Sequence, residues 1–161
     1  MEGLTHVDDS GHARLVDVSA RERTVRAATA TGRVVTTPVV LHVSAEGRLP
    51  KGDVGAVARI AGIQAAKQTP QLVPLCHPIA LHGVEVEIAV DHPAAAVTIA
   101  AHVRTVDRTG VEMEALTAVA VAGLAVIDMI KSLDPAACLS DVAVEAKDGG
   151  RSGAWRRPEV R

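Results

Sequence analysis

Four charged residues suited to proton transfer lie on one predicted helix, which follows Gly110. Glu112 and Glu114 stand at its start, Asp128 and Lys131 stand near its end, and no charged residue lies between Glu114 and Asp128. Carboxylates and lysines of this kind act as acids and bases on a bound substrate. At about 1.5 Å per residue, Glu114 and Asp128 would lie about 21 Å apart, too far to share one small reacting centre. Two such helices running antiparallel across a two-fold axis would bring the groups together, which predicts a site shared between subunits.

The same charges also have structural explanations. Thr109-Gly-Val-Glu112 fits a capping box, in which the two side chains satisfy free backbone N–H groups at the helix start. The helix dipole favours Glu114 in the first turn and Lys131 in the last. Asp128 is harder to explain, because the dipole disfavours a carboxylate there and pairing with Lys131 offsets this only in part. Asp128 is therefore the residue of this group that most needs a functional explanation.

Two segments are candidates for binding phosphate. Lys51 stands just ahead of a helix capped by Asp53, and a helix N-terminus favours anions, although a lone loop lysine is usually only solvated. The preceding residues lack the glycine pair of a P-loop. Gly149-Gly-Arg-Ser-Gly153 carries Arg151 and could fold over a phosphate, with a disordered tail as the more usual explanation.

The segment Pro74-Leu-Cys-His-Pro78 is bounded by prolines and predicts a rigid loop. Cys76 and His77 are adjacent and poorly placed to share one metal ion, and no second pair stands at zinc spacing, so we expect no metal site. His77 is the better candidate for holding a substrate or moving a proton. The alternative is a histidine satisfied by backbone hydrogen bonds.

The hydrophobic pattern predicts an α+β domain with the ferredoxin-like split βαβ order, an antiparallel sheet with two main helices on one face. Alternating residues predict strands, and small apolar residues at helical spacing predict helices. In chain order we expect an extended arm (15–18), a strand (25–35), a helix (54–67), two strands joined by a turn (84–90 and 97–103), a long helix (110–132) and a last strand (142–146). Residues 37–43 fit either a strand or a short helix after Pro38.

Composition narrows the class of protein. The 161 residues, 48% of them hydrophobic, suit a single domain (1–161) with mobile tails at 1–12 and 154–161. The chain has no Phe, no Tyr and one Trp, and its 17 Lys and Arg are outnumbered by 19 Asp and Glu, which argues against nucleic-acid binding. A core of Ala and Val buries little area, so we expect assembly to supply much of the stability.

The N-terminal residues and the apolar runs predict the cellular location of the protein. The longest uncharged run, 115–127, is shorter than the roughly 20 residues of a bilayer span, which predicts a buried helix and no membrane association. The first residues, 1–11, lack the basic start and apolar stretch of a secretory signal. We therefore expect a cytoplasmic protein with free thiols at Cys76 and Cys138.

Several segments together resemble the cyclic pyranopterin monophosphate synthase family of molybdenum cofactor biosynthesis. The resemblance extends from about Leu4 to Gly153, and its most specific part is the run around Glu112 to Glu114. The segments are Leu4-Thr-His6, Leu15-Val-Asp-Val-Ser19, Lys51-Gly-Asp53, 58–67, Pro74-Leu-Cys-His-Pro78, 108–118 and Asp128-Met-Ile-Lys131. Two departures are Arg151, where a lysine is more usual, and Pro38, which would delay a short helix of the family.

The resemblance implies an enzyme that converts (8S)-3',8-cyclo-7,8-dihydroguanosine 5'-triphosphate to cyclic pyranopterin monophosphate and diphosphate. It implies a homohexamer, built as a trimer of dimers, with active sites at the dimer interface. It also implies the site residues: substrate-binding Leu75, Cys76, His77, Glu112, Met113 and Glu114, and catalytic Asp128, Lys51 and Lys131.

Charge suggests roles for these residues and their neighbours. A triphosphate needs cations, which Lys51, Lys131, Arg26 and Arg151 can supply. No cofactor is required, and charge on the leaving diphosphate can be stabilised by a lysine or by Mg²⁺ bound with the triphosphate. A different class of function, a non-catalytic ferredoxin-like module for ligand binding or oligomerisation, is the alternative.

Overall fold

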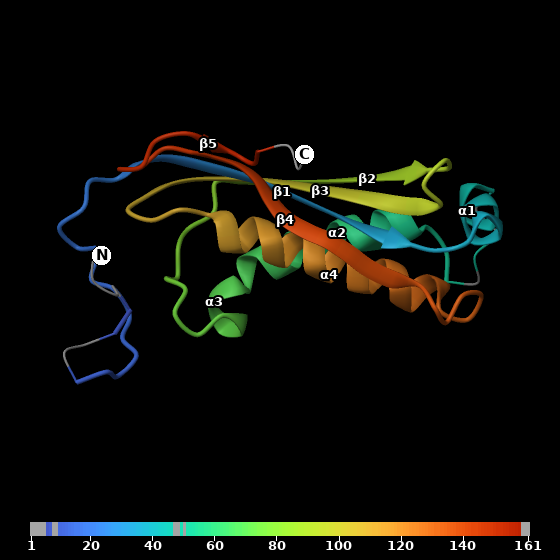
Figure 1. The fold of residues 1–161 in the computed structure, drawn as a ribbon, viewed down its shortest axis with the longest axis horizontal. Coiled ribbons are helices and arrows are strands. Elements are labelled where there is room, and N and C mark those ends of the chain that lie inside the picture. Colours follow the sequence, from blue (N-terminus) through green and yellow to red (C-terminus); the bar gives the residue numbers. More distant parts are fainter. Residues whose placement is uncertain (1–5, 8–9, 47–48, 50, 159–161) are drawn as a thin grey trace.

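The computed structural model describes residues 6–7, 10–46, 49 and 51–158 as one antiparallel sheet with helices packed on one face (Figure 1). The five strands lie in the order β2-β3-β1-β4-β5. The elements are β1 (Thr24–Val35), α1 (Pro38–Ala45), α2 (Val54–Lys67), α3 (Thr69–Leu72), β2 (Gly83–Asp91), β3 (Ala96–Asp107), α4 (Glu112–Ile130), β4 (Cys138–Asp148) and β5 (Trp155–Arg156).

The first four strands have the ferredoxin-like order predicted from the hydrophobic pattern. β1 lies in the middle, antiparallel to β3 on one side and to β4 on the other, and β3 continues to β2. Alternate residues of β1, including Ala28, Ala30 and Val34, are buried under the helices. The predicted α+β fold is therefore confirmed, with α2 and α4 as the two main helices.

Small residues allow the helices and the sheet to approach closely. A Cβ added at Gly32 of β1 would lie 2.7 Å from Val119 of α4, and one at Gly62 of α2 would lie 3.0 Å from the Ala118 carbonyl oxygen. Contacts shorter than ordinary packing distance would force these elements apart, so the glycines fix the position of α4. By length and composition α4 could cross a membrane, but half of that stretch is buried inside the protein, as in the core helix of a globular domain.

Local details at the helix ends differ from the sequence predictions. The capping box was wrong, because Val111 is the N-cap of α4 and no side chain caps it. Glu112 instead forms an ion pair with Lys147 of β4, 3.4 Å away, a tertiary contact that local spacing cannot reveal. The helix ends at Ile130, two residues before the predicted end, with Lys131 as its C-cap.

The open choice over residues 37–43 is resolved in favour of a helix. α1 begins at Pro38 and is capped by the Thr37 hydroxyl, which accepts a hydrogen bond from the Val40 N–H at 3.4 Å. The expected delay at Pro38 was wrong, because proline suits the first position of a helix, where its missing N–H is not needed.

The structure contains two short elements that were not predicted, β5 and α3. Residues 155–156, expected in the C-terminal tail, form β5 and pair with Ala146 and Lys147. A helical turn, α3, begins at the predicted break at Thr69-Pro70, and the expected loop, 74–78, is irregular. Residues 1–5, 8–9, 47–48, 50 and 159–161, and the predictions made for them, lie outside the described residues.

Candidate active site

Two adjoining cavities lie beside the start of α4. Their volumes are about 570 and 580 Å³, and both are lined by Arg21, Thr109, Gly110 and Glu112. Half of the residues that line the first cavity are charged, four of them basic and three acidic, whereas the surface of the second is mostly apolar. Together they form a two-part cleft large enough for a ligand with a polar and an apolar half.

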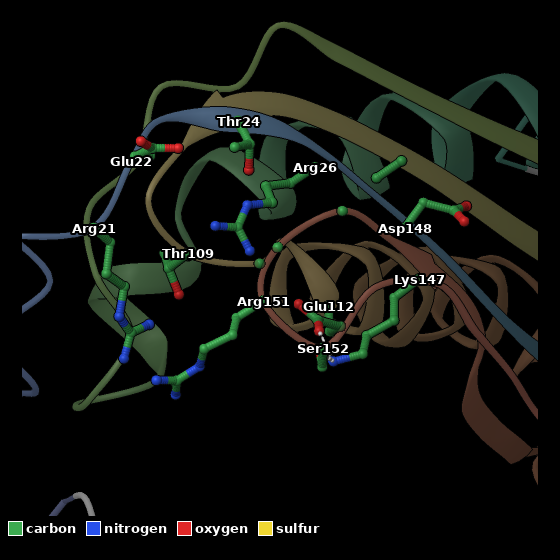
Figure 2. A pocket seen from close by; sticks show the side chains of 14 residues that line it. Arg21, Glu22, Thr24, Arg26, Thr109, Glu112, Lys147, Asp148, Arg151 and Ser152 are labelled. Atoms are coloured by element: carbon green, nitrogen blue, oxygen red, sulfur yellow. Dashed lines mark hydrogen bonds and ion pairs between the residues drawn. The ribbon is translucent and has the colours of Figure 1, made fainter.

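Four cations from two segments of the chain, 21–26 and 147–151, line the first cavity (Figure 2). Arg26 reaches in from β1, Lys147 from β4, and Arg21 and Arg151 from the loops on its rim. Arg26 and Arg151 were predicted from the sequence as phosphate-binding cations, whereas Arg21 and Lys147 were not. The only sequence signal for Lys147 is its place two residues before Gly149.

The glycine-rich segment makes room for Arg26. Gly149 and Gly150 have φ values of +89° and +79°, which favour glycine. A Cβ at Gly150 would overlap the Arg26 guanidinium, so these glycines allow the side chain to lie against the loop. The segment is therefore built into the cavity wall and is more than a tail.

Unsatisfied polar atoms gather at the cleft. Among the residues that the structure describes, three buried side-chain polar atoms have no hydrogen-bond partner. Arg26 Nε and Thr24 Oγ1 belong to residues that line the first cavity, and Glu114 Oε2 belongs to the residue that accepts a hydrogen bond from Cys76 in the wall of the second. Buried polar atoms in native proteins are normally paired, so the two unpaired atoms in the wall of the first cavity are consistent with a polar ligand there.

The loop Pro74–Pro78, predicted from the sequence, forms part of the wall of the second cavity. Leu75, Cys76 and His77 line it together with Met113 from α4. Leu75 and Met113 remain partly exposed and give the cavity an apolar surface. The Cys76 thiol donates a hydrogen bond to Glu114 Oε1 at 3.5 Å, so the loop and the helix start meet directly.

Burial controls the ionisation of this Cys76–Glu114 pair. Glu114 is 1% exposed, and desolvation raises the pKa of its carboxyl above the usual range. Desolvation, followed by the charge of Glu114, raises the pKa of the Cys76 thiol from 9.0 to about 11. The thiol therefore stays protonated at neutral pH and acts as a hydrogen-bond donor rather than a nucleophile.

We expect Cys76 to resist alkylation. A pKa near 11 lowers its thiolate fraction at pH 8 about a hundredfold relative to an ordinary thiol. Cys138 is exposed and provides the comparison within the same chain. Peptide mass spectrometry after timed iodoacetamide treatment should find Cys138 modified first, and equal rates would contradict the raised pKa of the Cys76 thiol. A Glu114→Gln variant should speed the reaction of Cys76, because it removes the neighbouring negative charge.

The remaining predicted residues form a separate cluster at the other end of α4. Lys51 Nζ lies 2.6 Å from Asp128 Oδ2 and donates a second bond to the Asp128 carbonyl oxygen at 2.8 Å. Lys131 Nζ lies 2.7 Å from Asp128 Oδ1. These contacts, first with Lys131 and then with Lys51, lower the pKa of Asp128 to about 2. The carboxylate is therefore ionised at neutral pH, with one lysine on each oxygen.

The structure thus gathers the predicted site residues into two groups. Leu75, Cys76, His77, Met113 and Glu114 meet at the start of α4, with Glu112 on the wall shared by both cavities. Lys51, Asp128 and Lys131 meet at its end. The helix is unbroken over 112–130, so about 21 Å separates the groups within one subunit. Within the described part of the chain, no three His, Cys, Asp or Glu side chains converge as a metal site.

Comparisons with known proteins match nearly the whole chain to one family. The model of the MoaC family matches residues 15–150. A cyclic pyranopterin monophosphate synthase of Nocardioides sp. is 57% identical over 156 residues, which covers 96% of each chain. The synthase of Streptomyces griseus is 57% identical, covering 96% of this chain and 86% of its own, and that of Thermomicrobium roseum is 52% identical, covering 99% and 96%.

Proposed function

The chain belongs to the MoaC family, and on that premise we propose that it is a cyclic pyranopterin monophosphate synthase of molybdenum cofactor biosynthesis. Its substrate is (8S)-3',8-cyclo-7,8-dihydroguanosine 5'-triphosphate, and its products are cyclic pyranopterin monophosphate and diphosphate. The observation that carries this assignment is the two-part cleft, whose charged half suits a triphosphate and whose apolar half suits a guanine-derived ring.

The apolar half holds the ring. Leu75 and Met113 supply aliphatic contact in place of aromatic stacking, because the chain has no Phe or Tyr and its one Trp does not line this cavity. The unpartnered Oε2 of Glu114 accepts a hydrogen bond from a ring N–H. An analogue that lacks this N–H would leave the buried oxygen unpaired, which costs binding energy. Hydrogen bonding therefore makes the apolar half of the cleft selective for the ring.

The charged half holds the triphosphate. Arg26, Arg21, Arg151 and Lys147 supply positive charge from four positions around the first cavity. In the free protein Lys147 contacts Glu112 and donates to the Ser152 hydroxyl at 3.2 Å. Phosphate oxygens compete for the same ammonium group, so Glu112 keeps Lys147 positioned until the substrate arrives. Mg²⁺ bound with the triphosphate would share the charge.

The Lys51–Asp128–Lys131 cluster supplies the chemistry. Ring opening and ring closure need proton transfers, and loss of diphosphate needs charge stabilisation on the leaving oxygens. With a pKa near 2, Asp128 is an anion at neutral pH and cannot donate a proton. It accepts hydrogen bonds from both ammonium groups and holds them in place, so Lys51 and Lys131 are the cations that reach the substrate.

A second subunit completes the site. The outer face of α4 carries an exposed or half-exposed stripe from one group to the other, formed by Met113, Thr117, Ala120, Leu124 and Asp128. Leu124, which is 58% exposed, is the large apolar side chain near the middle of this stripe. Two α4 helices packed antiparallel through this stripe, centred near Val121, place Glu114 of one subunit opposite Asp128 of the other. We propose that three such dimers form a homohexamer and that this homohexamer is cytoplasmic.

The decisive experiment supplies purified protein with the cyclic dihydroguanosine triphosphate and measures diphosphate release. The unaltered protein should release diphosphate and form cyclic pyranopterin monophosphate, whereas Lys51→Ala should release little. Lys67→Ala, an exposed lysine at the end of α2, is the matched control and should retain activity. A protein that binds the substrate without releasing diphosphate would instead be the non-catalytic ferredoxin-like module.

A further inference from the structure

An extended arm, residues 15–23, crosses the end of the molecule where α4 begins (Figure 1). It contains the motif Leu15-Val-Asp-Val-Ser19, to which the proposed function gives no role. Val16 and Val18 line the apolar cavity, and His77 lines both this cavity and a neighbouring one whose wall includes residues 15–19 of the arm. The arm and the loop that carries His77 are therefore parts of one wall.

One hydrogen bond connects them and determines the chemistry of His77. The distance between His77 Nε2 and the Val16 carbonyl oxygen is 2.7 Å. A carbonyl oxygen only accepts hydrogen bonds, so Nε2 must carry the proton. In the neutral imidazole the lone pair then lies on Nδ1, which has no hydrogen-bond partner among the described residues.

A hydrogen-bonded turn at residues 17–21 holds the arm in this place. The Ser19 N–H donates to Asp17 Oδ1 at 2.8 Å, and the Arg21 N–H donates to the Val18 carbonyl at 3.0 Å. Arg108, next to the shared wall residue Thr109, donates from Nε to the Arg21 carbonyl at 2.9 Å. The Val16 carbonyl is thus oriented by a turn on one side and is not a chance contact of a loose chain.

We propose that this arm is a positioning element that keeps Nε2 of His77 protonated, so that Nδ1 serves as the proton acceptor toward the substrate. This inference rests on the proposed function. When a substrate proton moves to Nδ1, the ring becomes an imidazolium and its Nε2–H bond to the Val16 carbonyl becomes charge-assisted. The arm therefore stabilises the protonated product of that step more than the starting state.

The first test reads the tautomer directly. The ¹⁵N resonances of histidine distinguish a protonated from an unprotonated ring nitrogen, and His77→Gln identifies the His77 signals by their loss. We expect Nε2–H with unprotonated Nδ1 in the substrate-free protein whenever the ring is neutral. A dominant Nδ1–H form would overturn the arm's role, whatever the activity of the protein.

The second test loosens the arm without touching the cleft. Asp17 is exposed, so Asp17→Ala removes the turn's acceptor at no cost in packing, whereas Asp17→Asn keeps an oxygen at the same place. We expect Asp17→Ala to mix the tautomers and to lower kcat on the order of tenfold, the effect of losing a histidine's orienting partner, with Asp17→Asn close to the unaltered protein. Unchanged tautomer and kcat in Asp17→Ala would contradict the proposal.

The third test asks whether the same bond holds the arm. Trypsin cleaves after arginine, and the arm offers Arg21 and Arg23. His77→Gln retains an N–H donor near the Nε2 position and should leave cleavage slow, whereas His77→Ala should accelerate it. Equal cleavage in both variants would contradict the bond. If the tautomer is correct but no diphosphate is released by the unaltered protein, the proposed function fails and the catalytic role of Nδ1 fails with it.

Discussion

An Asp128→Asn variant is expected to lose roughly a thousandfold in kcat, within the range for loss of a group that controls proton transfer. Asparagine has nearly the shape of aspartate but no charge, so it cannot hold two ammonium groups at 2.6 and 2.7 Å. Lys51 and Lys131 would then repel each other and leave the positions from which they reach the substrate. Steady-state diphosphate release measures the loss, and KM should change less than kcat.

Asp141→Asn is the matched control for this prediction. Asp141 is also an exposed aspartate in an ion pair, with Arg33 on the sheet, and it lies outside both groups of site residues. Its replacement should leave kcat within about twofold, because an exposed ion pair contributes little to the fold. An Asp128→Asn enzyme that keeps more than about a tenth of kcat would rule out the carboxylate as the centre of the cluster.

Two inactive variants, Glu114→Gln and Asp128→Asn, are expected to restore activity when their subunits assemble together. If each site takes Glu114 from one subunit and Asp128 from another, random assembly of equal amounts leaves about a quarter of the sites with both residues intact. Co-expressed and co-purified subunits should therefore recover about a quarter of the unaltered activity. Native mass spectrometry of differently tagged subunits confirms that mixed assemblies have formed.

A second pair of variants distinguishes sharing from other causes of recovery. Asp128→Asn and Lys131→Ala alter the same end of α4, so every mixed site would contain one defect and no activity should return. Adding Leu124→Glu to both members of the first pair should break the α4 contact and abolish recovery. Mixed assemblies of the first pair that remain inactive would place the whole site within one subunit.

The lack of Phe and Tyr has a practical use in these experiments. Trp155 is the only tryptophan, and it pairs with Lys147 through β5, beside the charged cavity. Its fluorescence therefore reports on that end of the molecule alone. This single signal can follow binding of diphosphate in variants that are too slow to assay by turnover.

Much of the fold could be predicted because its signals are local. Alternation along 84–90 and 97–103, helical spacing from Val54, and the stop signals at Thr69-Pro70 and Asp134-Pro135 involve residues close in sequence, and the structure has these elements. The capping box failed for the opposite reason. The spacing of Thr109 and Glu112 allowed it, but Lys147, 35 residues from Glu112 along the chain, provides the carboxylate with a charged partner.

The sequence by itself determined the α+β order, the single long apolar helix and the residue types of the site. It also determined that Glu114 and Asp128 cannot meet within one straight helix, because the rise per residue is constant. Only the tertiary structure decided which partners these residues have. The bonds of Lys51 with Asp128, Cys76 with Glu114 and His77 with Val16 span 77, 38 and 61 residues. Such contacts depend on how the helices and the arm pack on the sheet, and no local pattern encodes that packing.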